Sequence, residues 1–410
     1  MIALGEVQAA IFGAVPRLEP VEVGDLRDAL GLVLAQRITA PEAVPPFANT
    51  AMDGYAVQAA DTVGASEEQP VRLQVVGELA AGHVPTVAVG RGEAIRIMTG
   101  APMPDGADAI VMVERTRREG EDGVAVTLVV EPGQHVRRAG GDLEAGDVVF
   151  ESGAVLGAAR IGVLATVDAR RARVFPRARV GVLSTGDELV ESGPLSPGKI
   201  RDSNRPMLLA QLAGAGATPI DLGSAHDDES VMTATLDDAI ERCDAVITSG
   251  GVSVGDFDYV SDALERIAAD DPAGASAVDW YQVAIKPAKP LCFGMLRGTP
   301  VFGLPGNPVS SFVSFELFAR PALLQMMGHD QIRRPEVIAR AAQAMSRRRD
   351  GKLHLDRVVV RVEDGRYVAT GVRSQESNAL AASAAANGLA LLPDGEGVGE
   401  GDDVIVMLID

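Results

Sequence analysis

The sequence has almost no cysteine and little histidine. Its 410 residues include two cysteines and five histidines. Cys243 and Cys292 lie far apart in the chain among apolar residues, and the histidines nowhere have the spacing of metal ligands. A zinc or thiolate site built by the protein is therefore not expected, and both cysteines are predicted to pack in the core.

The chain also lacks a long apolar run and a conspicuous run of lysine and arginine. No apolar stretch reaches the roughly 18 residues of a membrane span, and the N-terminus shows no signal peptide. The 37 lysines and arginines stand against 57 aspartates and glutamates, a net charge of −20. Because nucleic acid and anionic membranes repel such a surface, we expect a cytoplasmic protein that binds neither.

A chain of 410 residues is too long for one hydrophobic core, so two to four domains are expected. The first forty residues predict two amphipathic helices, and the second places four apolar residues at helical spacing: Leu26, Leu30, Val33 and Leu34. Residues 46–139 predict a β-rich domain of short segments separated by glycine and proline. Its flanks, residues 1–45 and 140–176, are predicted to form one elongated linking and dimerisation domain.

From Arg179 onward, short apolar segments alternate with helical patterns. Strands are expected at 180–183, 218–222 and 244–248, with helices at 204–213 and 228–243. This alternation predicts a parallel sheet with helices on both faces, in an α/β domain of residues 177–326.

The β pattern returns over residues 327–410. Asp364-Gly365 between two apolar segments predicts a hairpin with a type I′ turn. The expected fold class is therefore α/β plus β, with a parallel-sheet domain, a β-rich insertion, an elongated mixed domain and a C-terminal β-barrel-like domain.

A glycine-rich turn follows the predicted strand at 244–248, with the sequence Thr248-Ser-Gly-Gly-Val-Ser-Val-Gly-Asp-Phe-Asp-Tyr259. Glycines allow backbone amides to approach a phosphate closely. The amides of Gly250, Gly251 and Gly255 and the hydroxyls of Ser249 and Ser253 are thus predicted to bind an anion. Asp256 and Asp258 follow at once, and carboxylates beside a phosphate indicate a hard divalent cation between them.

Two further polar turns follow predicted strands. They are Ser184-Thr-Gly-Asp-Glu188 and Leu304-Pro-Gly-Asn-Pro308, in which Asn307 is a predicted N-cap and Pro308 the first helical residue. Ligands of parallel sheets bind at the carboxyl ends of the strands, so the three turns are expected to meet there. Asp187 and Glu188 either complement a helix N-terminus or, together with Asp258, bind Mg²⁺.

Lys286-Pro-Ala-Lys289 places two cations three residues apart on a stretch stiffened by proline. Alone, the pair is most simply explained as two solvated lysines. In the same α/β unit as an acidic turn and a phosphate loop, both are predicted to face one anion.

Six motifs in order resemble the molybdopterin molybdenumtransferase family, which includes the E-domain of gephyrin. They are Pro45-Pro-Phe-Ala-Asn-Thr-Ala-Met-Asp-Gly-Tyr-Ala-Val57, Arg96-Ile-Met-Thr-Gly-Ala-Pro102, Ser184-Thr-Gly-Asp-Glu-Leu189, Ser249-Gly-Gly-Val-Ser-Val-Gly255, Lys286-Pro-Ala-Lys-Pro290 and Leu304-Pro-Gly-Asn-Pro-Val-Ser310. The match extends from the first residue to the C-terminal region.

The resemblance implies the last step of molybdenum cofactor synthesis. In that step molybdate is inserted into adenylylated molybdopterin and AMP is released in a Mg²⁺-dependent reaction. It also implies a cytoplasmic homodimer whose active sites lie between the α/β domain of one subunit and the β-rich domain of the other. A molybdopterin adenylyltransferase and molybdoenzyme maturation factors are expected as protein partners.

The resemblance also implies roles for individual residues. Glu188, Asp227 and Asp258 match positions that the family uses to bind metal and pyrophosphate, and Asp187 is a further metal candidate beside Glu188. Lys286 and Lys289 match the lysines that bind the oxyanion. The remaining positions are substrate contacts: Asp53, Thr99 and Asp142 from the partner subunit, Pro305 and Pro308 beside the pterin, and Arg357 and Ser377 in the last domain. Glu376 replaces the family's usual glycine, and its negative charge is expected to weaken anion binding.

Two other functions fit parts of the chain. A molybdopterin adenylyltransferase would have the same α/β unit, but the β-rich insertion with its Ala-Met-Asp-Gly-Tyr motif argues against it. A receptor-clustering module such as the E-domain of gephyrin would use a peptide-binding surface. Release of AMP on addition of molybdate separates the transferase from both.

Overall fold

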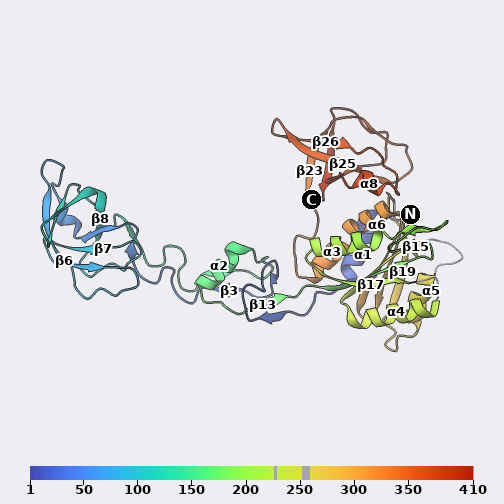
Figure 1. The fold of residues 1–410 in the computed structure, drawn as a ribbon, viewed down its shortest axis with the longest axis horizontal. Helices are drawn as coiled ribbons and strands as arrows, with labels where there is room; N and C mark the ends of the chain where they lie inside the picture. Colours follow the sequence, from blue (N-terminus) through green and yellow to red (C-terminus); the bar gives the residue numbers. More distant parts are fainter. Residues whose placement is uncertain (226–228, 252–258, 410) are drawn as a thin grey trace.

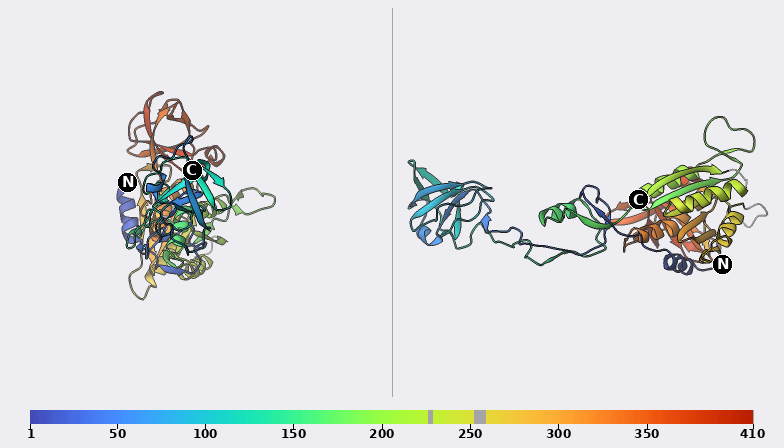
Figure 2. Two further views of the ribbon diagram at one scale, coloured as in Figure 1. Left: turned by 90° about the vertical axis from the view of Figure 1, so that its left-hand side faces the viewer. Right: turned by 90° about the horizontal axis from the view of Figure 1, so that it is seen from below.

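The molecule consists of two bulky ends joined by a thin arm (Figures 1 and 2). The computed structural model describes residues 1–225, 229–251 and 259–409. A β-rich domain forms one end, and the α/β domain with the C-terminal β domain forms the other. Within the described residues, no helix is long and apolar enough to cross a membrane.

The α/β domain is built on a six-stranded sheet with the order β17-β14-β18-β22-β21-β19. The first four strands are parallel and the last two antiparallel: β17 (Thr218–Ala225), β14 (Arg179–Thr185), β18 (Ala245–Ser249), β22 (Thr299–Leu304), β21 (Pro290–Leu296) and β19 (Ala277–Gln282). The helices of this part are α3 (Asn204–Gly214), α4 (Glu229–Arg242), α5 (Tyr259–Ala269), α6 (Pro308–Ser314), η3 (Phe315–Ala319) and α7 (Arg320–Met326).

The predicted alternation of strands and helices is confirmed. Strands β14 and β18 are buried along nearly their whole length, as expected for the centre of a parallel sheet covered on both faces. Cys243 and Cys292 are both buried in one cluster beneath α4 and α5, which agrees with a packing role.

The N-terminal helix α1 (Leu4–Ala14) packs on the α/β domain. Val7 and Ile11 are fully buried, in the same core cluster as Phe315 and Leu323 from η3 and α7. Sequence reasoning assigned this helix to the linking domain, but its apolar face packs in the core of the α/β domain instead.

The second predicted N-terminal helix is wrong. Residues 26–31 form turns, and Val33–Leu34 is a short strand, β2. The backbone bonds within this stretch join residues i and i+3, such as Ala29 N–H to the Leu26 carbonyl (3.2 Å), and Gly31, which has φ +78°, donates instead to the distant Leu156 carbonyl (2.8 Å). Glycine in this left-handed conformation ends any helical path, while Leu26 and Leu34 still reach the core of the arm.

The arm is formed by two passes of the chain that run antiparallel. β3 (Ile38–Thr39) pairs with β12 (Val148–Phe150), and β4 (Asn49–Thr50) pairs with β11 (Val136–Arg137). At its base, β1 (Val21–Val23), β13 (Ala172–Phe175) and β2 form a three-stranded sheet beside α2 (Ala158–Thr166). One hydrophobic cluster combines side chains from both passes.

The β-rich domain is a six-stranded sheet with the order β8-β5-β7-β6-β10-β9. Its strands are β5 (Gly54–Val57), β6 (Val71–Leu79), β7 (Glu93–Ile97), β8 (Ala109–Met112), β9 (Thr116–Glu119) and β10 (Gly123–Val126), with the short helices η1 (Ala59–Thr62) and η2 (Val113–Arg115).

The C-terminal domain is a closed barrel, because β25 pairs with both β26 and β27. Its strands are β23 (Glu336–Ala341), β25 (Leu353–Glu363), β26 (Arg366–Gly371), β27 (Gly388–Leu392) and β29 (Asp403–Leu408), beside the short helix α8 (Leu380–Ser383). Asp364 and Gly365 have φ +48° and +75° between paired Glu363 and Arg366, which confirms the type I′ turn.

The shortest strands lie at the edges of these units. β15 (Leu189–Val190) pairs with β16 (Ile200–Arg201), and β24 (Met345–Ser346) pairs with β28 (Gly397–Val398). β20 (Ile285–Lys286) leaves the α/β domain to pair with β25, so the barrel is attached through strand pairing beside Lys286.

Candidate active site

Polar turns meet at the carboxyl ends of β14, β18 and β22. They line a cleft of about 390 Å³, here called the rim cleft. Its described lining combines Thr185, Gly186 and Glu188 after β14, Ser249, Gly250 and Gly251 at β18, and Pro305, Gly306 and Asn307 after β22. The predicted convergence of the three turns is therefore present.

Asn204 ties two of these turns together. Its side-chain Nδ2 donates to Ser249 Oγ (2.8 Å) and to the Gly306 carbonyl (2.7 Å), and its buried Oδ1 has no hydrogen-bond partner among the described residues. Sequence reasoning missed this residue. The only signal was an asparagine at the start of the helix predicted over residues 204–213.

Gly250 shapes the turn after β18. Its φ is +98°, and a Cβ at this position would lie 2.8 Å from the Thr185 carbonyl oxygen. The Gly250 N–H donates to the Leu304 carbonyl (3.0 Å), so this amide joins neighbouring strands and is not free for a phosphate. The glycine is required by the backbone conformation.

Glu188 lies at the rim beside Gly186. A Cβ on Gly186 would lie 2.4 Å from Glu188 Oε2, so the carboxylate folds closely over a backbone that has no side chain. Lys199 Nζ donates to the backbone carbonyl of Asp187. Five of the predicted site residues lie outside the described residues: Asp227, Ser253, Gly255, Asp256 and Asp258. Among those described, no group of three or more His, Cys, Asp or Glu side chains gathers at one point.

Lys286 lines a second and larger cleft, of about 740 Å³, between β20 and the barrel, here called the barrel cleft. Arg357 lines the same cleft, so the structure brings together two predicted anion contacts that are 71 positions apart. Lys289 is exposed and precedes Pro290, which lines the rim cleft. The two lysines therefore do not line the same cleft.

Arg357 is 1% exposed, and its guanidinium contacts neutral oxygens. Nη2 donates to the carbonyls of Glu376 (3.1 Å) and Ser374 (3.4 Å), and Nε donates to Ser383 Oγ (3.3 Å). Burial lowers the pKa of this arginine, against a smaller opposing effect of Asp356. Within the described chain no carboxylate forms an ion pair with it, which leaves a buried positive charge open to an anionic ligand.

The barrel cleft is also lined by Arg347, Arg348 and Arg349, a basic run that sequence reasoning overlooked. Arg347 is held by Asp394 (2.7 Å) and Asp350 (2.8 Å). Burial alone would raise the pKa of Asp350, but hydrogen bonds from His354 and Lys352 lower it to about 2. The cleft therefore gathers cations on a chain whose net charge is −20.

Two of the predicted substrate-binding residues, Pro308 and Ser377, lie in segments that are joined by a hydrogen bond at the start of α6. The Val309 N–H donates to the Ser377 carbonyl (3.1 Å), which joins the last domain to the third rim turn. Asn307 is the N-cap and Pro308 the first helical residue, as predicted. The side chain of Glu376 is exposed, while its carbonyl accepts the bond from Arg357.

Asp53 and Thr99 also meet, but in the β-rich domain. Asp53 Oδ1 accepts from the Thr99 N–H and hydroxyl, both at 2.7 Å, and these two bonds lower the pKa of Asp53. Asp142 lies in the arm, where its N–H donates to the Val44 carbonyl (2.9 Å). Within one chain, the β-rich domain lies at the opposite end of the molecule from both clefts (Figure 1).

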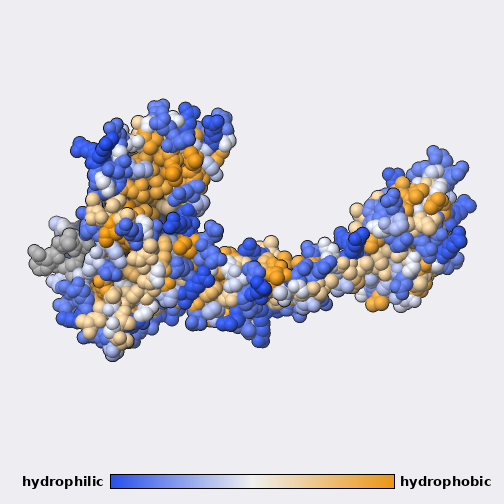
Figure 3. Space-filling view, turned by 180° about the vertical axis from the view of Figure 1, so that it is seen from behind, coloured by the Kyte–Doolittle hydropathy of each residue, from blue (hydrophilic) through white to orange (hydrophobic). Residues whose placement is uncertain are grey.

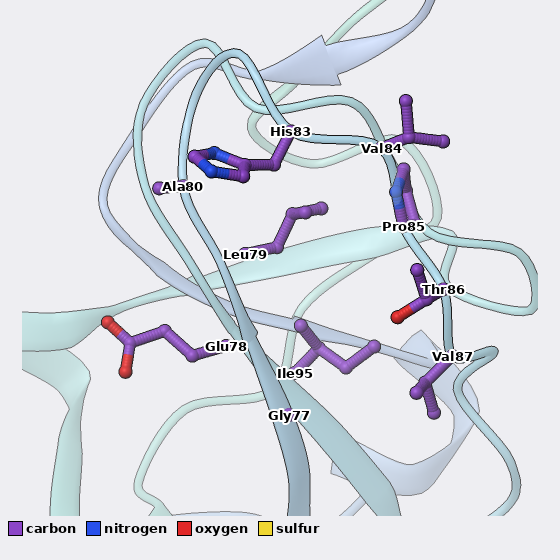
Figure 4. Close-up of a pocket in the computed structure, with 10 residues that line it drawn as sticks. All are labelled: Gly77, Glu78, Leu79, Ala80, His83, Val84, Pro85, Thr86, Val87 and Ile95. Atoms are coloured by element: carbon purple, nitrogen blue, oxygen red, sulfur yellow. The ribbon is translucent and has the colours of Figure 1, made fainter.

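The β-rich domain has a pocket of its own, of about 480 Å³. Figure 4 shows Leu79 and Ile95 beneath the loop from His83 to Val87, with the carboxylate of Glu78 turned to the side. No lysine or arginine lines it, so it offers an oxyanion no permanent positive charge.

Family models cover most of the chain. Residues 2–167 match the MoeA N-terminal region (domain I and II), residues 181–325 a probable molybdopterin binding domain, and residues 340–409 the MoeA C-terminal region (domain IV). A molybdopterin molybdenumtransferase 2 of Mycobacterium tuberculosis is 40% identical over 96% of each chain. The chain belongs to the molybdopterin molybdenumtransferase family. Its function accordingly lies in molybdenum cofactor biosynthesis.

Other relatives agree. A molybdopterin molybdenumtransferase of Bacillus subtilis is 36% identical over 94% of this chain and 89% of its own. The crystal structure of a molybdopterin biosynthesis moeA protein from Pyrococcus horikoshii OT3 matches with a TM-score of 0.82 and 30% identity over the whole of both chains. The resemblance inferred from six motifs and the expected multidomain fold are confirmed.

Proposed function

We propose that this transferase inserts molybdate into adenylylated molybdopterin and releases AMP. The observation that supports this most is the barrel cleft, which is lined by both Lys286 and the buried Arg357. Molybdate is a small dianion, and a fixed pair of cations in a partly buried cleft favours it over a neutral ligand. Lys289, Ser377 and the rim turns border the space that the pterin and its phosphates would occupy.

The rim cleft fits a hard cation. Glu188 and Asp187 offer carboxylate and carbonyl oxygens, and Gly186 leaves the Glu188 carboxylate room beside the backbone. We assign Mg²⁺ to these residues, with Asp227 and Asp258 as further candidates. When bound, the ion would neutralise charge on the phosphate oxygens of the substrate. Ser249, Gly251, Pro305 and Pro308 would position the rest of the ligand.

The active enzyme in this proposal is a homodimer. The β-rich domain, which holds Asp53 and Thr99, lies at the opposite end of the molecule from the α/β and C-terminal domains (Figure 1), and Asp142 lies in the arm. A partner subunit would therefore supply all three residues. Exposed valines and leucines on the arm and its base support association: Val21, Leu30, Val148 and Val155. An adenylyltransferase that supplies the substrate and maturation factors that accept the product are the expected protein partners.

Release of AMP tests the proposal. Purified protein mixed with adenylylated molybdopterin and Mg²⁺ is expected to release AMP only when molybdate is added. Glu188→Ala and Lys286→Ala should each lower the rate of AMP release more than a hundredfold. This corresponds to a rise of about 2.7 kcal/mol in the activation free energy. The matched control is Glu191→Ala, whose exposed carboxylate pairs with Arg205 outside both clefts. AMP release that does not depend on molybdate would contradict the proposed reaction.

A further inference from the structure

The barrel contains an opening between two of its strands. β23 pairs with β29 along Glu336–Arg340, but it pairs with β26 only through Arg340 with Val368 and Ala341 with Ala369. In this register the next pairs would be Ala339 with Tyr367 and Ile338 with Arg366, and neither of them forms. A pocket of about 520 Å³ fills the resulting wedge. We call this pocket the β23–β26 wedge; it is lined by Ile338, Arg340, Gly365, Arg366, Tyr367, Gly401 and Asp403.

The open edge of β23 presents backbone groups to the wedge. At the two ends of the ladder, the Leu408 N–H donates to the Pro335 carbonyl and the Ala341 N–H to the Asp402 carbonyl, both at 2.9 Å. Odd-numbered residues of β23 therefore bond to β29, and the N–H and C=O of Ile338 point to the wedge. An unpaired strand edge of this kind can bind another extended chain.

The side chains around this edge are cationic and apolar. The wedge contains Arg340 and Arg366 against the single carboxylate of Asp403, and neither arginine has a carboxylate within ion-pair distance in the described part of the chain. Ile338 is 67% exposed and Tyr367 41% exposed. Arg340 extends over Gly401, where an added Cβ would lie 3.6 Å from its Nη2. Figure 3 shows hydrophobic residues gathered on the surface of this domain.

We propose that the β23–β26 wedge is a docking site for an extended acidic segment of a partner protein. The segment would add to the open edge of β23, place a carboxylate between Arg340 and Arg366, and pack an apolar side chain against Ile338 and Tyr367. Charge complementarity favours an acidic segment, because the wedge presents two unpaired arginines against a single carboxylate.

The wedge is separate from both clefts. His354, which lines the barrel cleft, and Glu363, next to the wedge, are nine residues apart on β25, so roughly 30 Å apart along an extended strand. Partner binding at the wedge therefore leaves the barrel cleft accessible, and a protein that supplies substrate or accepts product could bind while the enzyme turns over.

The test uses the full-length protein and a fluorescein-labelled ten-residue peptide of alternating glutamate and valine. Saturable binding followed by fluorescence anisotropy is expected for the wild type, and at least tenfold weaker binding for Arg366→Glu and Arg340→Glu. The matched control is Arg361→Glu, an exposed cation of β25 outside the wedge, which should bind within twofold of wild type. A lysine–valine peptide should not bind, and AMP release should be unchanged in Arg366→Glu.

A backbone variant tests strand addition separately. Ile338→Pro removes the N–H that points to the wedge without removing a bond to β29, and should weaken the peptide at least fivefold while circular dichroism stays unchanged. The proposal is overturned by absent binding to the wild type, by equal loss in Arg361→Glu, or by full binding in Ile338→Pro. Salt-sensitive self-association that is lost in Arg366→Glu would overturn it as well, since the occupant would then be a second copy of this chain.

Discussion

At the scale of single residues, the proposed site depends on a buried arginine whose hydrogen-bond partners are all uncharged. Arg357 is buried against two carbonyls and a hydroxyl, whereas Arg205, near the rim, is bound by three carboxylates. Burial alone would lower the pKa of Arg205, but those carboxylates raise it. The charge of Arg205 is thus neutralised by carboxylates of the same chain, which indicates a structural role. The positive charge of Arg357 remains available to a ligand.

Arg357→Lys should separate charge from geometry. Lysine keeps the positive charge but loses the planar fork that bonds the Ser374 and Glu376 carbonyls. The molybdate concentration for half-maximal AMP release should rise about tenfold, or about 1.4 kcal/mol. Arg361→Lys on the exposed face of β25 is the control. Equal molybdate requirements in the two variants would show that Arg357 does not bind the anion.

Asp350 should make the barrel less stable in acid. Its folded pKa, about 2, lies below the ordinary 3.8, so its contribution to stability is present above about pH 4 and lost as the pH falls toward 2. Asp350→Asn removes that contribution. The difference in Tm between wild type and variant should therefore shrink steadily from about pH 5 to pH 2. A constant difference over this range would mean that the carboxylate has an ordinary pKa.

At the scale of elements, the sequence predicts what is local. Val180 to Leu183 and the strand before Ser249 are uniformly apolar and bounded by turns, which sufficed to place β14 and β18 and the turns after them. The helix expected around Leu30 fails because Gly31 adopts a left-handed conformation that apolar spacing does not reveal. The roles of Asn204 and of the basic run at Arg347 depend on contacts between distant segments, so no local pattern predicts them.

Gly250→Ala should disrupt the turn after β18. Its positive φ and the 2.8 Å approach to the Thr185 carbonyl both oppose a side chain, at a cost of about 1–3 kcal/mol. Gly223→Ala is a matched control, since it has φ +80° but no atom within 4 Å of the added Cβ. Gly250→Ala should lower Tm and AMP release more than the control does. Similar losses of Tm and activity in the two variants would show that backbone strain alone, and not the contact with Thr185, explains the effect.

At the scale of the whole molecule, the separation of Asp53 from the two clefts is the main constraint on the proposed site. Sequence analysis placed Asp53, Thr99 and Asp142 with the clefts only through the family resemblance to a dimer. The single chain keeps them apart, because a two-pass arm separates the β-rich domain from the α/β domain (Figure 2). The proposed shared site would therefore need a second subunit to bring these residues to the clefts.

Mixing two inactive variants tests that arrangement. Asp53→Ala and Lys286→Ala, co-expressed so that subunits combine at random, should recover roughly a quarter of wild-type AMP release. About half of the dimers would be mixed, and each would contain one intact site of two. No recovery in purified mixed dimers would show that both residues serve one chain and that the shared site is wrong.

The pairing of β4 with β11 has a consequence for how this protein can be rebuilt. The chain enters the β-rich domain at Thr50 and leaves it at Val136, and these two residues are register partners. The two ends of the domain are thus adjacent, so the domain can be deleted or exchanged without changing the path of the rest of the chain. A two-residue turn joining Thr50 to Val136 would close the arm as an ordinary hairpin, and the excised sheet could be grafted onto another hairpin of the same register.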